Sequence, residues 1–340
     1  MRIISLLPSA TEIAVALGLG DQLVGVSHEC DYPPDVVAGK PVVTSSLVPK
    51  TATEPFDGEE GEEPPPSAQE IDRIVREALA NGESLYRIDI DLLRELKPDI
   101  ILTQGLCDVC AVSHKAVVAA VNALGPDVTV LDLQPTDLAT VLESFRQVGA
   151  ATGKESEADA LVASVQARWD AVREKASRAT DRPKTLLLEW PDPPFTSGHW
   201  NPEFLALANG EPAPWDETGT PSRTLTWNEI ADFAPEMVVL LACGMDAYRA
   251  LDESYAFLDV PQWFDLPAVK NGECYTVDGN AYFNRPGPRL AESAEILATI
   301  LHPDLFTNML PAYSVQRFDN ELFEPLEDDE DGEDAEAPTP

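Results

Sequence analysis

KESEADALVASVQARWDAVREKASR, residues 154–178, is the stretch that decides the fold of this chain. It contains no Gly or Pro, and its apolar residues recur at the i, i+3, i+4 and i+7 positions of one helix face. These residues are Ala158, Leu161, Val162, Val165, Trp169, Val172 and Ala176. A helix of this length spans roughly 37 Å, about the width of a small domain. The single apolar stripe indicates that the helix lies across two domains and connects them.

Short apolar runs alternate with helical patterns on both sides of this stretch. The predicted strands are 3–7, 23–27, 41–44, 99–104, 128–133, 185–190, 237–242 and 273–277. The predicted helices are 11–17, 68–80, 89–95, 115–124, 137–150, 202–208, 227–233 and 288–301. Such alternation is typical of parallel sheets with helices on both faces. We therefore expect an α/β fold of two Rossmann-like lobes, 1–150 and 183–304, joined by a single long rigid helix within 151–182.

The charge balance is strongly acidic, with 60 Asp and Glu against 23 Lys and Arg and a net charge of −37. We expect 50–67 to be an acidic insertion and 305–340 to be an acidic disordered tail, because Glu- and Pro-rich segments bury too little apolar surface to fold. The charge argues against nucleic acid and anionic membranes as partners, since both need basic patches. It either attracts a cationic partner or, as we favour, forms the solvated surface of a halophilic protein, whose self-repulsion salt screens.

Several features bear on the compartment. No segment approaches the ~20 consecutive apolar residues of a membrane span. The apolar run 3–7 is shorter than the core of a secretory signal, and Glu12 interrupts the residues that follow. Five Cys is an odd number without the spacing of a disulfide framework, which fits a reducing compartment. We therefore expect a cytoplasmic monomer without membrane insertion.

The sharpest local signal is the pair Cys107 and Cys110, which follows one predicted strand and precedes a predicted helix. His28 and Cys30 follow another strand, at the same edge if the sheet is parallel. Three thiols and an imidazole are a ligand set suited to zinc or another thiophilic metal. A redox pair at a helix N-terminus is a second interpretation. A third is that the two Cys are small residues that fill a tight loop.

An aromatic loop follows the first strand of the second half, over 189–200. It contains Trp190, Phe195, His199 and Trp200 among several prolines. Aromatic faces on a stiff loop suit a large, flat, apolar ligand, because little entropy is lost on binding. The loop could also fold on its own aromatic residues. His199 could ligate a metal centre, although a hydrogen-bonded loop residue is the commoner case.

A second polar segment, 278–289, follows the last predicted strand and opens the last predicted helix. Arg285 within it could hold a ligand amide or carboxylate through its fork of donors, or it could form a surface ion pair. The chain has no phosphate loop, dinucleotide fingerprint or Gly-x-Ser-x-Gly elbow, and no catalytic triad is visible. The motifs therefore favour a binding protein over an enzyme.

Several short motifs, taken in order along the chain, resemble a known family. SLLPSATE at 5–12, GVS at 25–27 and DYPP at 31–34 look like the opening of the cobalamin-binding proteins of ABC importers. PPFTSG at 193–198, Phe283 with Arg285, and Pro288 with Arg289 are similar to the second lobe of that family. The resemblance, to the cobalamin and ferric-siderophore group, covers about 1–304 apart from the insertion. It implies a class III periplasmic-binding-protein fold, with two α/β lobes, a rigid connecting helix and the ligand between the lobes.

The resemblance also implies which residues line the cleft. In the first lobe these are Pro8, Ser9, Ala10, Thr11 and Tyr32, with Gln104 and Gly105 at a further contact position. In the second lobe they are Phe195, Tyr282, Phe283 and Arg285. The implied ligand is a corrinoid such as cobalamin. In this interpretation aromatic residues, including Trp190 and Trp200, pack on the ring, and His199 or Cys107 approaches the cobalt.

Two features depart from the family pattern. Family importers dock on their permease through one glutamate per lobe, and the corresponding places hold His114 and Asn228 here. Cys30, Cys107 and Cys110 are additions to the pattern. These departures point away from delivery to a membrane permease and leave ligand binding untouched. We expect the recipient to be a cytoplasmic acceptor protein or, as in the family, an ABC permease. Two alternatives stay open: a cytoplasmic metal- or redox-active protein that uses the three Cys, and a ferric-siderophore-binding importer component.

Overall fold

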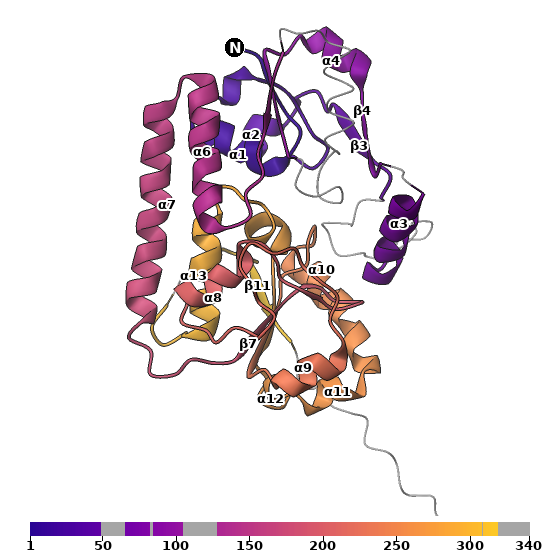
Figure 1. Ribbon diagram of the computed structural model, residues 1–340, viewed down its shortest axis with the longest axis vertical. Helices are drawn as coiled ribbons and strands as arrows, with labels where there is room; N and C mark the ends of the chain where they lie inside the picture. The colour runs from indigo at the N-terminus through magenta and orange to yellow at the C-terminus, as the bar shows by residue number, and fades with distance from the viewer. Residues whose placement is uncertain (49–64, 82–83, 105–127, 308, 319–340) are drawn as a thin grey trace, which may run out of the picture.

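Two α/β lobes lie one above the other in the computed structural model, with two long helices along one side (Figure 1). The structure describes residues 1–48, 65–81, 84–104, 128–307 and 309–318. The predicted helix at 115–124 and four residues singled out above lie outside this range, namely Gly105, Cys107, Cys110 and His114. The predicted fold class, α/β with parallel sheets and flanking helices, is confirmed.

The first lobe is built on a parallel sheet whose described strands have the order β2-β1-β5-β6. The strands are β1 (Ile3–Ser5), β2 (Leu23–Val26), β5 (Ile100–Thr103) and β6 (Thr129–Asp132). Its helices are α1 (Pro8–Ala16), α2 (Pro34–Val37), α3 (Ala68–Ala80), α4 (Ile90–Leu96) and α6 (Leu138–Thr152). Strands β1 and β5 are buried on both faces, which explains why they are continuous apolar runs in the sequence.

A small two-stranded antiparallel sheet consists of β3 (Thr44–Ser46) and β4 (Tyr86–Ile88), with α3 between them along the chain. The strand predicted at 41–44 is therefore shifted. It begins at Thr44, and Val42 forms only an isolated bridge with Val26. Helix α1 also begins three residues before the predicted 11–17, because Pro8 is well suited to the first helical position, where its missing N–H is not needed.

The second lobe is built on a mixed sheet with the order β11-β10-β9-β7-β8. Its strands are β7 (Thr185–Trp190), β8 (Phe195–Thr196), β9 (Met237–Leu240), β10 (Cys274–Val277) and β11 (Val315–Arg317). Its helices are α8 (Asn201–Leu207), α9 (Trp227–Phe233), α10 (Ala247–Ser254), α11 (Pro261–Asp265), α12 (Pro267–Lys270) and α13 (Leu290–Leu301). The three inner strands are parallel, and the two edge strands are antiparallel to their neighbours.

The start of the tail at 305 is wrong. Strand β11 pairs with β10 and closes one edge of the second sheet. Phe306 and Phe318 are 1% and 4% exposed, so both side chains belong to the core. Two aromatic residues ahead of the acidic run supply enough apolar surface to hold this segment on the lobe. The second lobe therefore extends at least to residue 318.

Helix α7 (Glu155–Ala176) connects the lobes as predicted. It packs against α6 of the first lobe and against α8 and α13 of the second. Trp169 is 2% exposed, and its indole N–H donates to the Leu290 carbonyl at 3.0 Å. Arg168 binds Glu292 and Glu295 of α13. One apolar core runs along this helix through both lobes, which fixes their relative position.

Candidate functional site

The face between the two lobes carries the candidate site. Strand β1 runs into the first turn of α1, and this turn meets the loop that precedes α13 in the second lobe. A Cβ on Gly287 of that loop would lie 3.6 Å from Ser9 Cα and 3.3 Å from a Glu12 oxygen. The lobes are therefore in van der Waals contact here. Ser9, Ala10 and Thr11 are buried by this contact, and of the predicted turn only Pro8 is partly exposed.

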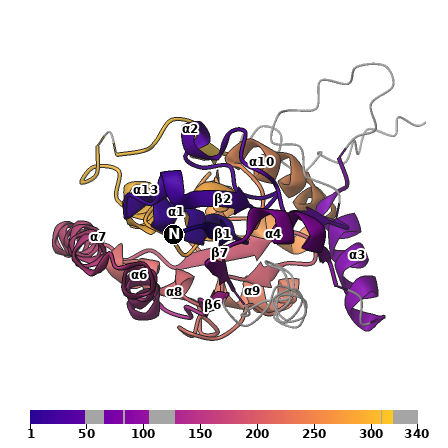
Figure 2. The same cartoon turned by 90° about the horizontal axis from the view of Figure 1, so that it is seen from above.

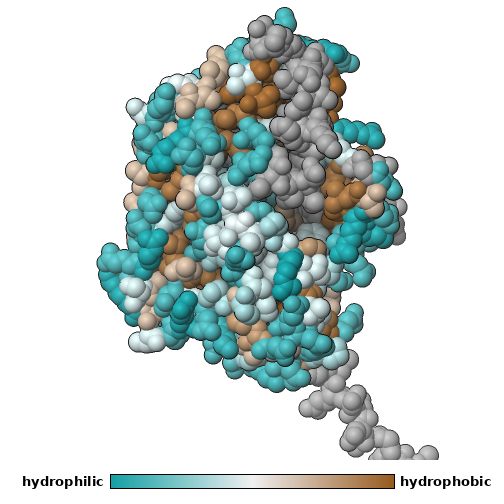
Figure 3. All heavy atoms as spheres, viewed as in Figure 1, coloured by the Kyte–Doolittle hydropathy of each residue, from teal (hydrophilic) through white to brown (hydrophobic). Residues whose placement is uncertain are grey.

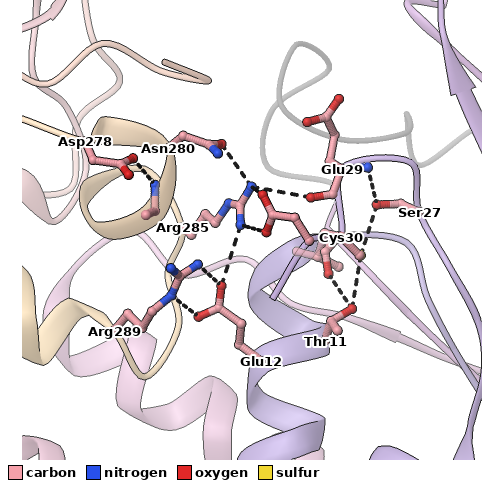
Figure 4. A network of polar contacts seen from close by, with 12 residues as sticks. Thr11, Glu12, Ser27, Glu29, Cys30, Asp278, Asn280, Arg285 and Arg289 are labelled. Atoms are coloured by element: carbon pink, nitrogen blue, oxygen red, sulfur yellow. Dashed lines mark hydrogen bonds and ion pairs between the residues drawn. The ribbon is translucent and has the colours of Figure 1, made fainter. Parts of the chain in front are cut away.

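Among the described residues, three ion pairs cross from lobe to lobe at this contact, Arg289 with Glu12, Arg285 with Asp31 and, at 3.8 Å, Arg285 with Glu12 (Figure 4). Arg289 donates from Nε to Glu12 Oε2 at 3.0 Å and from Nη2 to Glu12 Oε1 at 2.6 Å. Arg285 donates through both terminal nitrogens to the Asp31 carboxylate, with Nη2 and Oδ2 2.9 Å apart. Nη2 of Arg285 also donates to Asn280 Oδ1 at 2.9 Å. The predicted ligand-holding arginine is thus paired within the protein.

Burial sets the electrostatics of this network. Glu12 is 4% exposed, and desolvation raises the pKa of its carboxyl, against the opposing charges of Arg289 and Arg285. Burial also acts to raise the pKa of Asp31, but the hydrogen bonds and charge of Arg285 outweigh it and lower the pKa. Two carboxylates and two guanidinium groups balance each other, so the network has no net charge.

Aromatic residues flank the network. Arg289 lies over the Tyr32 ring at 4.1 Å and near the Tyr282 ring at 5.6 Å, measured to the ring centroids. Tyr32 belongs to the first lobe and is 42% exposed, while Tyr282 belongs to the second and is partly exposed. The two predicted tyrosines therefore lie at the junction of the lobes, with the Arg289 guanidinium within reach of both rings.

His28 and Cys30 are the described members of the predicted metal site. Cys30 Sγ lies 3.1 Å from Thr11 Oγ1 and 3.2 Å from Ser27 Oγ, within hydrogen-bond distance of both (Figure 4). Burial raises the pKa of the Cys30 thiol, which disfavours the thiolate that a metal needs. Among the described residues no three His, Cys, Asp or Glu side chains gather in a way that suits a metal ion. The metal site stays a prediction, because Cys107 and Cys110 lie outside those residues.

Of the aromatic residues predicted to face the ligand in the second lobe, some are buried in the core and others are partly exposed. Phe283 is fully buried against Phe204, and Trp200 is 6% exposed and donates its N–H to the Phe283 carbonyl at 2.9 Å. Their predicted place on the cleft wall is wrong, because both rings fill the core beneath α13. Phe195 and His199 are partly exposed, and burial lowers the pKa of the His199 imidazole.

Some buried polar side-chain atoms have no hydrogen-bond partner among the described residues. Two of them lie at the carboxyl ends of parallel strands, Thr103 Oγ1 at the end of β5 and Trp190 Nε1 at the end of β7. Gln104, next to Thr103, is 7% exposed. In open α/β sheets, ligands bind at the carboxyl ends of parallel strands. These atoms are therefore available to hydrogen-bond a ligand.

Sequence reasoning missed Glu12, Asp31 and Arg289 as site residues. Glu12 carries a visible signal, since it is the lone charged residue in its helix. Its partner lies 277 positions away along the chain, and no local pattern reveals such a pair. The ion pairs thus belong to the tertiary structure rather than to any motif.

Among the residues that the structure describes, no helix has both the length and the apolarity needed to cross a bilayer.

Solved structures share the fold. The periplasmic heme-binding protein RhuT from Roseiflexus aligns with a TM-score of 0.63 and 21% identity, covering 89% of this chain and 98% of the other. The periplasmic vitamin B12 binding protein BtuF of Vibrio cholerae aligns with a TM-score of 0.60 and 21% identity, covering 88% and 96%. At these identities the likeness shows the fold alone.

Curated relatives extend along most of the chain. An ABC transporter substrate-binding lipoprotein of Bacillus subtilis, YvrC, is 28% identical over 90% of this chain and 81% of its own. A vitamin B12-binding protein of Vibrio cholerae is 24% identical over 88% of each. The family model for periplasmic binding proteins matches residues 3–281. Family members are substrate-binding proteins of ABC transporters rather than enzymes. The chain therefore belongs to the periplasmic binding protein family, within a two-lobed fold that relatives of this kind share.

Proposed function

We propose that this chain binds a corrinoid, cobalamin or a close relative, between its two lobes. The observation that carries the proposal is the similarity, over 88% of both chains, to relatives named vitamin B12-binding protein. The solved structures with this fold include heme-binding and B12-binding proteins, so the fold alone leaves the ligand open. The choice between these ligands rests on the chemistry of the site.

The charge of the site favours a neutral ligand. Haem carries two propionate anions, whereas a corrinoid carries neutral amide side chains around its ring. Arg285 and Arg289, the cations of the lobe contact, are both paired with carboxylates of the first lobe. The net charge of −37 repels anions further. The arginines are therefore not available to neutralise a dianion.

The unpartnered polar atoms favour the same ligand. Trp190 Nε1 is a donor, and Thr103 Oγ1 donates or accepts, so the two atoms match both the C=O and the NH₂ of an amide. Leaving such atoms unpaired in a buried place costs about 1–3 kcal/mol each, and a bound amide removes that cost. Peripheral amides of a corrinoid are suitable partners.

Visible absorbance tests the proposal. Cyanocobalamin titrated into the protein at molar salt is expected to shift its spectrum and saturate at one equivalent. Trp190→Phe keeps a ring and removes the N–H, so it is expected to weaken binding about tenfold, by about 1.4 kcal/mol. Trp215→Phe is the matched control, because its N–H is also unpartnered but lies beside Phe233 of α9, at the end of the second lobe far from the first (Figure 1). Saturation by haemin with no cyanocobalamin binding contradicts the proposal.

The recipient of the corrinoid and its compartment stay predictions. Asn228, in the place of a docking glutamate, accepts a hydrogen bond from Gln262 at 3.2 Å. The neighbouring Glu229 caps α9 and pairs with Arg223, contacts that lower its pKa to about 2. Cell fractionation separates the two predicted recipients. Protein in the cytoplasm favours a cytoplasmic acceptor, and protein outside the cytoplasmic membrane favours an ABC permease.

A further inference from the structure

Helix α3 belongs to the first lobe by sequence and contacts the second lobe in space. It lies between β3 and β4 along the chain. Its first backbone N–H, on Ala68, donates to Glu253 Oε2 of α10 at 2.7 Å. Arg249 of α10 donates from Nη2 to the Pro66 carbonyl at 2.9 Å and also binds Glu253. The start of α3 is thus fixed to α10 by polar contacts in which both α10 side chains are mostly buried.

The apolar face of α3 is directed to the same lobe. Ala68 and Ile71 are 1% and 7% exposed and belong to the core cluster of the second lobe, and Val75 packs against that cluster. The three positions share one helix face at i, i+3 and i+7. The opposite face carries charged residues, and Leu79, one turn beyond Val75 near the end of the helix, is 45% exposed. The apolar face of this amphipathic helix therefore packs on the second lobe, although the helix belongs to the first lobe by sequence.

The position of α3 relative to α7 also bears on the contact between the lobes. Helix α7 joins the lobes on one side, and α3 lies on the opposite side of the molecule in both views (Figures 1 and 2). The surface view shows the neighbourhood of α3 as a mixed apolar and polar face (Figure 3). The site residues between the lobes lie between these two connections.

We infer that α3 is a clasp that fastens the first lobe to the second on the side opposite α7, and that a ligand leaves the cleft only when the clasp detaches. The part that concerns ligand release rests on the proposed function. A helix of 13 residues is marginal in water by itself, so the order of α3 depends on its docking. The docked face is small compared with either lobe core, so the clasp detaches without unfolding a lobe.

Ile71→Asp tests the clasp, because it places a charge in the apolar face that contacts the second lobe while it changes no residue of that lobe. Leu79→Asp is the matched control, since it makes the same change on the same helix at an exposed position. Hydrogen exchange and tryptic cleavage at Arg73 and Arg76 report docking without any ligand. Both are expected to be slow in the wild type and in Leu79→Asp, and at least about tenfold faster in Ile71→Asp. Equal rates in all three proteins overturn the clasp.

The rate at which bound cyanocobalamin dissociates in the presence of excess competitor tests whether the clasp limits ligand release. Ile71→Asp is expected to release it about tenfold faster than the wild type, and Leu79→Asp at the wild-type rate. Equal release rates in the presence of fast α3 exchange overturn the inference that the clasp holds the ligand. A wild type that binds no cyanocobalamin refutes the proposed function instead, and the exchange rates of α3 then decide whether the clasp exists.

Discussion

Arg289 has two roles at the lobe contact. It neutralises the buried Glu12 and lies over the Tyr32 ring. An isolated buried carboxylate is expensive, because its desolvation is no longer offset by an opposite charge. The stability of the lobe contact therefore depends on keeping both partners of this pair.

Arg289→Met is expected to lower the free energy of unfolding by about 3 kcal/mol, because the buried Glu12 loses both hydrogen bonds from Arg289 and keeps only the weaker ion pair with Arg285 at 3.8 Å. The double variant Glu12→Leu with Arg289→Met removes both charges and is expected to recover most of the loss. Urea denaturation of the wild type, both single variants and the double variant gives the coupling energy. A double variant no more stable than Arg289→Met alone contradicts the interpretation.

Asp216 supplies a pH-dependent prediction. Burial raises the pKa of its carboxyl from 3.8 to about 7, against the hydrogen bond from Ala213 N–H. A folded pKa above the unfolded one means that the folded state binds more protons between these values, so this contribution to stability is lost as the pH rises from about 4 to about 7. Asp216→Asn keeps an acceptor for Ala213 and removes the titration. The free energy of unfolding of Asp216→Asn minus that of the wild type is expected to be larger at pH 8 than at pH 4, by on the order of a few kcal/mol.

Denaturation of wild type and Asp216→Asn at several pH values checks this difference. The comparison cancels the repulsion of the other acidic groups, which both proteins share. A stability difference that is constant from pH 4 to pH 8 would show that Asp216 titrates in the folded state as it does in the unfolded one.

At the scale of elements, α6 and α7 pack very closely. Gly149 of α6 faces Ala158 of α7, and a Cβ at position 149 would lie 2.6 Å from the Ala158 Cβ and 3.0 Å from the Lys154 carbonyl oxygen. Glycine is needed here for close approach, although it lowers helix propensity. This junction fixes the start of the connecting helix.

Gly149→Ala is expected to destabilise the protein by about 1–3 kcal/mol, although the same change in an open helix position stabilises by about 0.5–1 kcal/mol. Adding Ala158→Gly removes the nearer clash and is expected to restore part of the loss. Thermal unfolding of the three proteins measures both effects. A more stable Gly149→Ala single variant contradicts the close packing.

The bounds of several elements could be predicted from local patterns. Helix α3, helix α9 and strand β7 begin and end where periodicity and capping residues place them. Strand β11 and the lobe that α3 docks on could not be predicted. Both depend on partners far away in the sequence, Tyr275 for Arg317 in β11 and Glu253 for Ala68 in α3. Local signals determine elements, whereas pairings between distant elements depend on the packed core.

The same limit applies to the candidate site. Tyr32, Tyr282 and Arg285 were predicted to line the ligand cleft; all three lie at the contact between the lobes, and their role in ligand binding stays a prediction. Phe283 and Trp200 were predicted on its wall and lie in the core. Residue type alone does not show whether an aromatic ring lies in the core or on the wall of the cleft. The direction of the ring depends on the packing around α13. Arg285 was predicted to face a ligand, and its pairing with Asp31 follows from the closeness of the lobes.

At the scale of the whole molecule, the contacts that hold the lobes together in the described part of the chain include the α7 core, the Glu12 and Asp31 ion pairs, and α3. Contacts on opposite sides of the molecule keep the distance between the two lobes nearly constant. Such a protein suits a rigid ligand, because neither the protein nor the ligand loses much conformational freedom on binding. A corrinoid ring is rigid, which agrees with the proposed ligand. The acidic surface, interpreted as suited to high salt, stays a prediction.

Equilibrium dialysis at molar salt against cyanocobalamin, haemin and a ferric hydroxamate siderophore tests the proposed ligand class most directly. We predict one cyanocobalamin bound per chain, with a dissociation constant of about 1 μM or less, corresponding to about −8 kcal/mol. Haemin is expected to bind at least about a hundredfold more weakly, because its propionates would need arginines that are already paired. The siderophore tests the remaining alternative ligand class. Tight binding of haemin or the siderophore, with cyanocobalamin left free, would contradict the corrinoid assignment.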